Sequence, residues 1–176
     1  MKHMKIVLRY ELSAVLLLMI LVAGCFTSNN MFSNKGDVLQ IVASTVEEVE
    51  KVLYYDDSGD VYEVTPSNSG NVLALVQARI INQKSTQISL FVDESAANLS
   101  IIESPKADPI YYLERGVKSS EVIPSEYKYG PFIWGQVDIP LGYEINGWMM
   151  FEVTKGSEYH SFIWEDADFV RIMYPR

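Results

Sequence analysis

The chain has 176 residues, one cysteine and a formal net charge of −9 at pH 7. This length allows one ordinary domain with a hydrophobic core of its own. A single cysteine excludes an intramolecular disulfide. The acidic charge argues against nucleic acid, because the phosphate backbone repels such a surface, so we expect no nucleic-acid partner.

The N-terminal stretch has the three parts of an export signal. Basic residues lie within the first nine positions, the apolar run Leu12–Val22 follows, and two small residues then precede Cys25. Eleven apolar residues are too few to cross a bilayer, which takes about 20. Residues 1–24 are therefore predicted to be a signal peptide. An uncleaved anchor helix over residues 7–26 and ordinary secretion are the alternatives.

The segment Leu21–Cys25 resembles the lipobox of lipoprotein signals. The resemblance implies cleavage before Cys25 and diacylation of this residue, which would hold the protein at the extracytoplasmic face of the membrane. Residues 1–24 carry a net charge of +2, so the remaining 152 residues carry −11. That part has no polybasic patch for anionic lipids, so the acyl chains on Cys25 would be its contact with the membrane.

A polar stretch follows the cysteine. Thr27–Gly36 is rich in Ser and Asn, which is typical of a flexible linker. We expect a tether over residues 25–36 and one folded domain over residues 37–176.

Alternation and β-rich composition predict strands in the first half of the domain. The clearest is Asn71–Asn82, in which every second residue from Val72 to Ile80 is apolar while Gln77 and Arg79 face the other way. This pattern predicts a half-buried antiparallel strand. Residues 45–55 fit either a helix or a strand. Other strands are expected at residues 38–42, 61–65 and 88–92.

The second half shows the same short segments between turn signals. Strand-like fragments occur at residues 99–103 and 110–113, and a loop or one helical turn is expected at 119–127. Further strands are predicted at 132–139, 147–154, 159–164 and 168–174, the last two as a hairpin. Many short strands and no βα alternation predict an all-β antiparallel sandwich or barrel.

Residues 71–174 also resemble a family of secreted and lipid-anchored bacterial and archaeal domains with a telokin-like, immunoglobulin-like sandwich. The shared landmarks begin with a long strand that ends in Asn (Val76–Asn82) and an Ile-Pro-x-Gly turn (Ile139–Gly142). A Gly-Trp-x-x-Phe-x-Val strand (Gly147–Val153), a Lys-Gly turn (Lys155–Gly156) and a closing strand (Phe169–Tyr174) follow. The resemblance implies an antiparallel immunoglobulin-like β-sandwich. The family has no assigned activity and supplies no catalytic residue.

Residues for catalysis or metal binding are scarce. His160 is the one histidine outside the signal segment, and no nucleophile elbow, P-loop or zinc motif occurs. Three carboxylates in one turn, Asp56, Asp57 and Asp60, are weak calcium candidates, but they lack the spacing and the distal Glu of a calcium loop. The acidic turn at residues 165–168 is a similar case. We predict no catalytic residue, no metal site and no cofactor.

Aromatic residues are the better candidates for function. The three Trp (134, 148 and 164) lie in apolar strands, where we expect core packing. Four tyrosines in loop-like sequence form the candidate contact patch, because Tyr is enriched at contact surfaces; they are Tyr111, Tyr112, Tyr127 and Tyr129. Asn98 begins an Asn-x-Ser sequon and is a candidate glycosylation site.

These features predict a non-catalytic, lipid-anchored surface protein. Its immunoglobulin-like domain would bind a protein or a glycan, or serve a role in the cell envelope. Two alternatives stay open: an extracytoplasmic hydrolase that depends on calcium or carboxylates, and a sensing or inhibitory module for an enzyme at the membrane surface.

Overall fold

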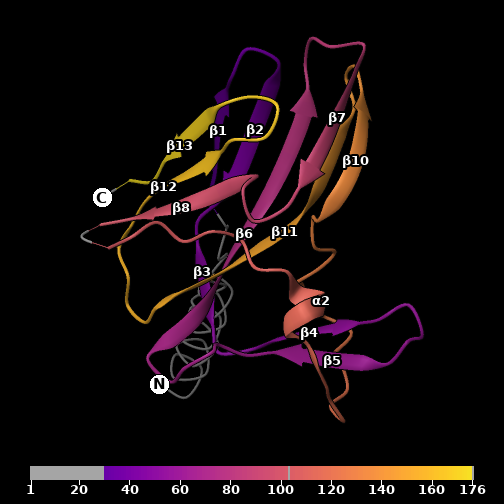
Figure 1. Cartoon of the computed structure of the whole chain (residues 1–176), viewed down its shortest axis with the longest axis vertical. Coiled ribbons are helices and arrows are strands. Elements are labelled where there is room, and N and C mark those ends of the chain that lie inside the picture. Colours follow the sequence, from indigo (N-terminus) through magenta and orange to yellow (C-terminus); the bar gives the residue numbers. More distant parts are fainter. Residues whose placement is uncertain (1–29, 103, 176) are drawn as a thin grey trace, which may run out of the picture.

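Two long strands organise the structure. The computed structural model describes residues 30–102 and 104–175, and in it β6 (Asn71–Asn82) pairs antiparallel with β11 (Glu144–Thr154) along nearly its whole length. The other edge of β6 is shared, since β2 (Leu39–Ser44) pairs with its second half and β3 (Glu47–Val49) with its first half. β1 (Met31–Lys35) extends this sheet beyond β2 (Figure 1).

A second group of strands packs on one face of this sheet. β12 (Tyr159–Trp164) lies between β8 (Ala97–Ile101) and β13 (Val170–Met173), and β7 (Gln87–Val92) pairs with β10 (Gly135–Pro140); all these pairs are antiparallel. The larger core lies between this group and the central sheet.

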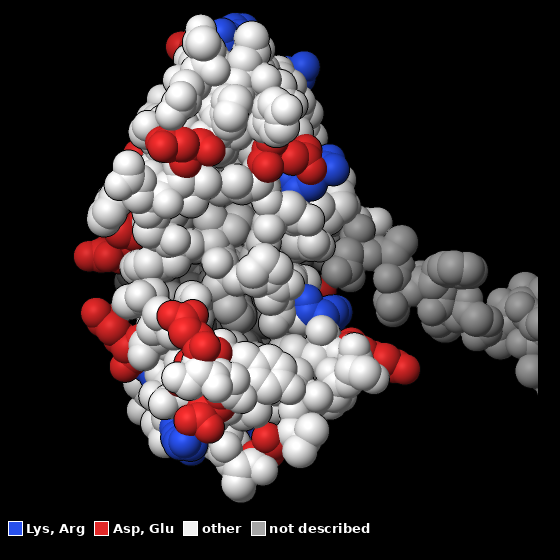
Figure 2. All heavy atoms as spheres, turned by 90° about the vertical axis from the view of Figure 1, so that its right-hand side faces the viewer, with Lys and Arg blue, Asp and Glu red and all other residues white. Residues whose placement is uncertain are grey.

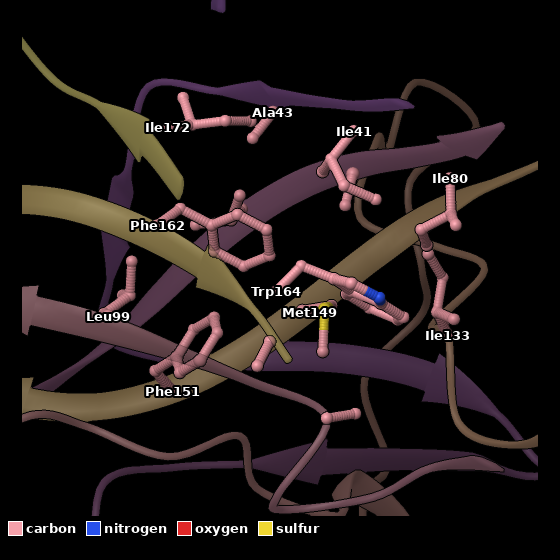
Figure 3. Packing of buried hydrophobic residues seen from close by; sticks show 14 of the residues in the cluster. Ile41, Ala43, Ile80, Leu99, Ile133, Met149, Phe151, Phe162, Trp164 and Ile172 are labelled. Carbon is pink, nitrogen blue, oxygen red and sulfur yellow. The ribbon is translucent and has the colours of Figure 1, made fainter. Parts of the chain in front are cut away.

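The larger core joins side chains from both layers. Figure 3 shows Phe162 and Trp164 of β12 pointing toward the strands that carry Met149 and Phe151. Phe162 and Trp164 are fully buried, and the Phe151 and Phe162 rings meet edge to face at 6.3 Å. Burial of a large apolar side chain contributes about 1.5–3 kcal/mol, so apolar packing alone can hold the layers together.

A smaller sheet covers part of the opposite face. It consists of β4 (Val52–Tyr55), β5 (Val61–Val64) and the two-residue β9 (Val117–Lys118), and the short helix α2 (Tyr112–Arg115) directly precedes β9. A second core cluster lies beneath it, formed by buried residues of β4, β5, β6 and β11: Val52, Tyr54, Val64, Leu73, Leu75, Trp148 and Met150.

The all-β, antiparallel prediction is confirmed: the described residues form thirteen strands and the single helix α2. The bounds of β6 and β12 agree with the prediction. The half-buried character of β6 holds only for its second half, because Leu73 and Leu75 are fully buried on the face that the β4–β5–β9 sheet covers.

Two segments differ from the sequence-based expectation, and a third resolves an alternative that the sequence left open. Met31–Lys35 lies within the predicted tether but forms β1, whose Phe32 packs edge to face on Tyr174 at 5.8 Å. Residues 45–55 are two short strands, which settles their ambiguity in favour of β-structure. Residues 110–113 are not a strand, since Tyr112 begins α2.

The predicted signal peptide and Cys25 lie outside the described residues, so cleavage before Cys25 and the acylation of Cys25 stay predictions. Among the residues that the structure describes, no helix has the length and apolar character needed to span a bilayer.

Candidate binding groove

Three separate segments bring tyrosines to one hollow beside the β4–β5–β9 sheet. β4 supplies Tyr54 and Tyr55, α2 supplies Tyr112, and the segment 123–132 supplies Tyr127 and Tyr129. The hollow has a volume of about 590 Å³. We call it the tyrosine groove; its lining residues are Leu53, Tyr54, Tyr55, Tyr112, Ile123, Pro124, Ser125, Tyr127, Tyr129, Gly130, Pro131 and Phe132.

The rings of the groove pack on one another. Tyr112 contacts Tyr54 edge to face at 4.9 Å between centroids and Phe132 at 4.8 Å. Tyr129 contacts Tyr127 at 5.3 Å and the buried Trp148 at 5.1 Å. Aromatic pairs in these geometries gain about 0.5–1.5 kcal/mol beyond burial, so the groove is largely preformed.

Hydrogen bonds fix the segment that carries Tyr127 and Tyr129. The Leu53 N–H donates to the Tyr127 hydroxyl at 2.7 Å, and the Tyr129 hydroxyl donates to Glu47 at 3.0 Å. Backbone bonds with Trp148 hold Pro131 and its neighbours at the floor: Trp148 N–H donates to the Pro131 carbonyl at 2.8 Å.

A glycine permits this close approach. A Cβ on Gly147 would lie 2.6 Å from the carbonyl oxygen of Pro131 and 2.8 Å from Cγ1 of Ile133. Only a residue without a side chain therefore lets segment 131–133 lie directly on β11.

The groove offers aromatic faces and hydroxyl donors. Burial raises the pKa of Tyr54, Tyr112 and Tyr127, so these hydroxyls stay protonated at neutral pH. Within residues 30–102 and 104–175 neither the hydroxyl of Tyr54 nor that of Tyr112 makes a hydrogen bond, but Tyr54 is buried with its hydroxyl against Gly116, so the partly exposed Tyr112 is the better donor to a ligand. Aromatic walls with a few donors suit stacking on a sugar ring or packing against an apolar, extended peptide.

The predicted contact patch is divided by the structure. Tyr112, Tyr127 and Tyr129 line the groove, but Tyr111 lines a second hollow beside it. There the Tyr111 ring stacks on Trp134, with 4.8 Å between ring centroids and 10° between ring planes. Trp148 and Trp164 are buried as expected, whereas Trp134 belongs to neither core cluster. The residues missed from sequence are Tyr54, Tyr55 and Phe132; the Tyr-Tyr pair at the end of β4 was the available signal.

The acidic turns serve structural roles. Asp56 accepts the N–H groups of Ser58 and Asp60, and Asp60 pairs with Lys118 at 2.5 Å. Asp57 lies in the same turn, and no set of three or more potential ligands that could hold a metal occurs among residues 30–102 and 104–175. Asp56 and Asp60 therefore have partners within the turn and on β9.

In the second acidic turn, Asp168 accepts the N–H groups of Asp37, Val38, Leu39 and Phe169. Burial raises the pKa of its carboxyl, but these backbone donors outweigh burial and lower the pKa. The carboxylate thus joins the turn after β12 to the start of β2.

The sequon asparagine is turned inward. Asn98 is 3% exposed, and its side-chain N–H group donates to Glu165 at 2.6 Å. A glycan needs an exposed attachment atom, so the folded domain argues against glycosylation at Asn98.

Comparisons of the chain with protein-family models, with curated proteins and with solved structures gave no match.

Proposed function

We propose that this protein is a non-catalytic binding domain whose contact site is the tyrosine groove. The observation that carries the proposal is the convergence of Tyr112, Tyr127 and Tyr129 with Tyr54 and Tyr55 on one hollow. Large, rigid side chains of this kind dominate the energetics of recognition sites. An extended segment of a partner protein or a glycan chain would lie along it.

We also propose that the antiparallel layers form an immunoglobulin-like sandwich. Its support is the shared core between β2, β6 and β11 on one side and β8, β12 and β13 on the other. A purely apolar core of this kind needs no disulfide.

We propose further that acyl chains on Cys25 hold the domain at the extracytoplasmic face of the membrane. Because β1 begins at Met31, only residues 26–30 separate Cys25 from the folded domain. Five residues span at most about 18 Å, so the domain would stay close to the bilayer. Cys25→Ser should abolish lipid labelling and leave unprocessed precursor; unchanged processing and membrane attachment would refute the anchor.

Photo-cross-linking from one groove position tests the binding site. Tyr55 is 57% exposed and lines the groove, whereas Tyr143 is 68% exposed and lies in the turn between β10 and β11. We would place a photoreactive phenylalanine at either position of the full chain in cells that produce it. An adduct of one discrete mass from position 55, absent from position 143, is expected.

Tyr112→Ala should remove this adduct, because it deletes one wall of the groove. Equal labelling from both positions, or an adduct that survives Tyr112→Ala, would refute the tyrosine groove as the contact site.

A further inference from the structure

A second hollow adjoins the tyrosine groove. It has a volume of about 560 Å³ and lies where β7 ends, where the chain enters β10 and where α2 begins. We call it the acidic hollow; its lining residues are Phe91, Asp93, Glu94, Pro109, Ile110, Tyr111, Glu114, Arg115 and Trp134. Figure 2 faces this side of the molecule and shows a depression across its middle with acidic side chains above and below it.

Aromatic faces form one part of this hollow. Tyr111 and Trp134 stack almost parallel, and Phe91 is 63% exposed. None of the three belongs to either core cluster; Tyr111 and Trp134 are half-buried and cover one face of each other, whereas the Phe91 ring is exposed. Exposed aromatic faces of this kind attract cations through the ring quadrupole.

Carboxylates form the other part. Glu94 and Glu114 are exposed, and neither makes an ion pair or side-chain hydrogen bond within the part of the chain that the structure describes. Asp93 accepts the N–H and hydroxyl of Ser95 and keeps its charge, because the hydroxyl and N–H of Ser95 lower its pKa. The one cation in the lining, Arg115, donates to Glu152 at 2.8 Å. The hollow therefore carries an excess of negative charge beside aromatic faces.

We propose that the acidic hollow binds an arginine side chain of a partner protein, an inference that rests on the proposed binding function. A guanidinium stacks on aromatic rings and bonds carboxylates through its planar fork, which an ammonium group does less well. The rings of Tyr111 and Tyr112 touch at 5.8 Å, so the two hollows adjoin. One extended segment could place an arginine in the acidic hollow and its neighbouring residues in the tyrosine groove.

Peptide binding tests this inference directly. We would reconstitute the full chain in nanodiscs of zwitterionic lipid and follow the anisotropy of a labelled hexa-arginine peptide at physiological salt. Hexa-citrulline, the neutral isostere, is the matched peptide. Loss of the positive charge should weaken binding at least about tenfold, because the cation–π and charge-assisted contacts both disappear. Equal binding of the two peptides would overturn the proposal.

Matched variants separate a specific site from the general acidity of the domain. Glu94→Gln with Glu114→Gln should weaken hexa-arginine binding about fivefold or more, since charge-assisted contacts are lost. Glu50→Gln with Glu158→Gln removes the same charge from exposed positions outside the hollow and should change affinity less than about twofold. Equal losses in the two pairs would overturn the proposal.

The aromatic faces are tested by Trp134→Leu, which should weaken binding about three- to tenfold; unchanged affinity would overturn their role. If hexa-arginine does not bind but the adduct from position 55 forms, the acidic hollow alone is refuted. Arginine binding without that adduct would refute the tyrosine groove alone.

Discussion

Replacement of Glu152 by Gln should destabilise the domain strongly at neutral pH. The Glu152 side chain is 10% exposed on β11. One carboxylate oxygen accepts the N–H and hydroxyl of Ser67 and the amide of Asn71, and the other accepts Arg115 at 2.8 Å. Burial alone raises the pKa of this carboxyl, but these donors outweigh it and lower the pKa to about 2.

The size of the effect follows from this pKa. A fall from the ordinary value of 4.5 to about 2 corresponds to about 3 kcal/mol of unfolding free energy at 1.36 kcal/mol per pKa unit. Because the folded-state pKa of Glu152 is depressed, this contribution is complete above pH 4.5, the ordinary value, and is lost as the pH falls toward the folded value. Glu152→Gln should therefore cost up to about 3 kcal/mol near pH 7 and about 1 kcal/mol near pH 2.5.

Urea denaturation of wild type and variant at the two pH values measures this difference. Glu144→Gln is the control, because its carboxylate is 43% exposed and lies 3.7 Å from Arg79; exposed pairs contribute about 0–1 kcal/mol. A cost of Glu152→Gln no larger than that of the control, or one equal at both pH values, would refute this account.

Four further substitutions test the packing. Ser161 is buried and its hydroxyl has no partner within residues 30–102 and 104–175, so Ser161→Ala should raise Tm or leave it unchanged. Ser44→Ala is the contrasting variant, because it removes hydrogen bonds to Thr45 and Gln77. It should cost about 1–3 kcal/mol of unfolding free energy in urea denaturation. Gly147→Ala should cost about 1–3 kcal/mol by overpacking against segment 131–133, and cross-linking from position 55 should fall with it. Phe162→Ala should cost about 3–5 kcal/mol by leaving a cavity. Three results would contradict these expectations: a lower Tm for Ser161→Ala than for Ser44→Ala, a Gly147→Ala domain as stable as wild type, and a cost of Phe162→Ala below about 1 kcal/mol.

The sequence predicts those parts of the fold in which alternation is long and clear. β6 and β12 have the expected bounds because each is an apolar, β-rich run between turn signals, with clear alternation in the second half of β6. β1 was missed because its five residues are mostly polar and exposed. α2 was missed because a four-residue helix is too short to show a period. Alternation also indicates which residues share a face but not what covers it, so the burial of Leu73 and Leu75 could not be foreseen.

The sequence predicts that the candidate site is made of tyrosines, but it does not predict which tyrosines line it. Tyrosines between strands indicate contact surfaces, and three of the four chosen line one groove. The division of Tyr111 from Tyr112 depends on the start of α2, and the inclusion of Tyr54 depends on the pairing of β4 with β5. The groove itself is a tertiary feature, because β4 meets α2 and the segment that carries Tyr127, which lie about 60 and 70 positions further along the chain.

The Glu152 network also connects stability with the candidate site. Arg115 is the last residue of α2, and Glu152 holds it on β11. The same helix begins at Tyr112 and directly follows Tyr111, so it positions one ring in each hollow. A domain that keeps its main core but loses the Glu152–Arg115 bond should therefore lose the alignment of the two hollows first. In Glu152→Gln at neutral pH, cross-linking from position 55 and hexa-arginine binding should both decline while the domain is still folded, because the weakened bond is one that holds α2 against β11.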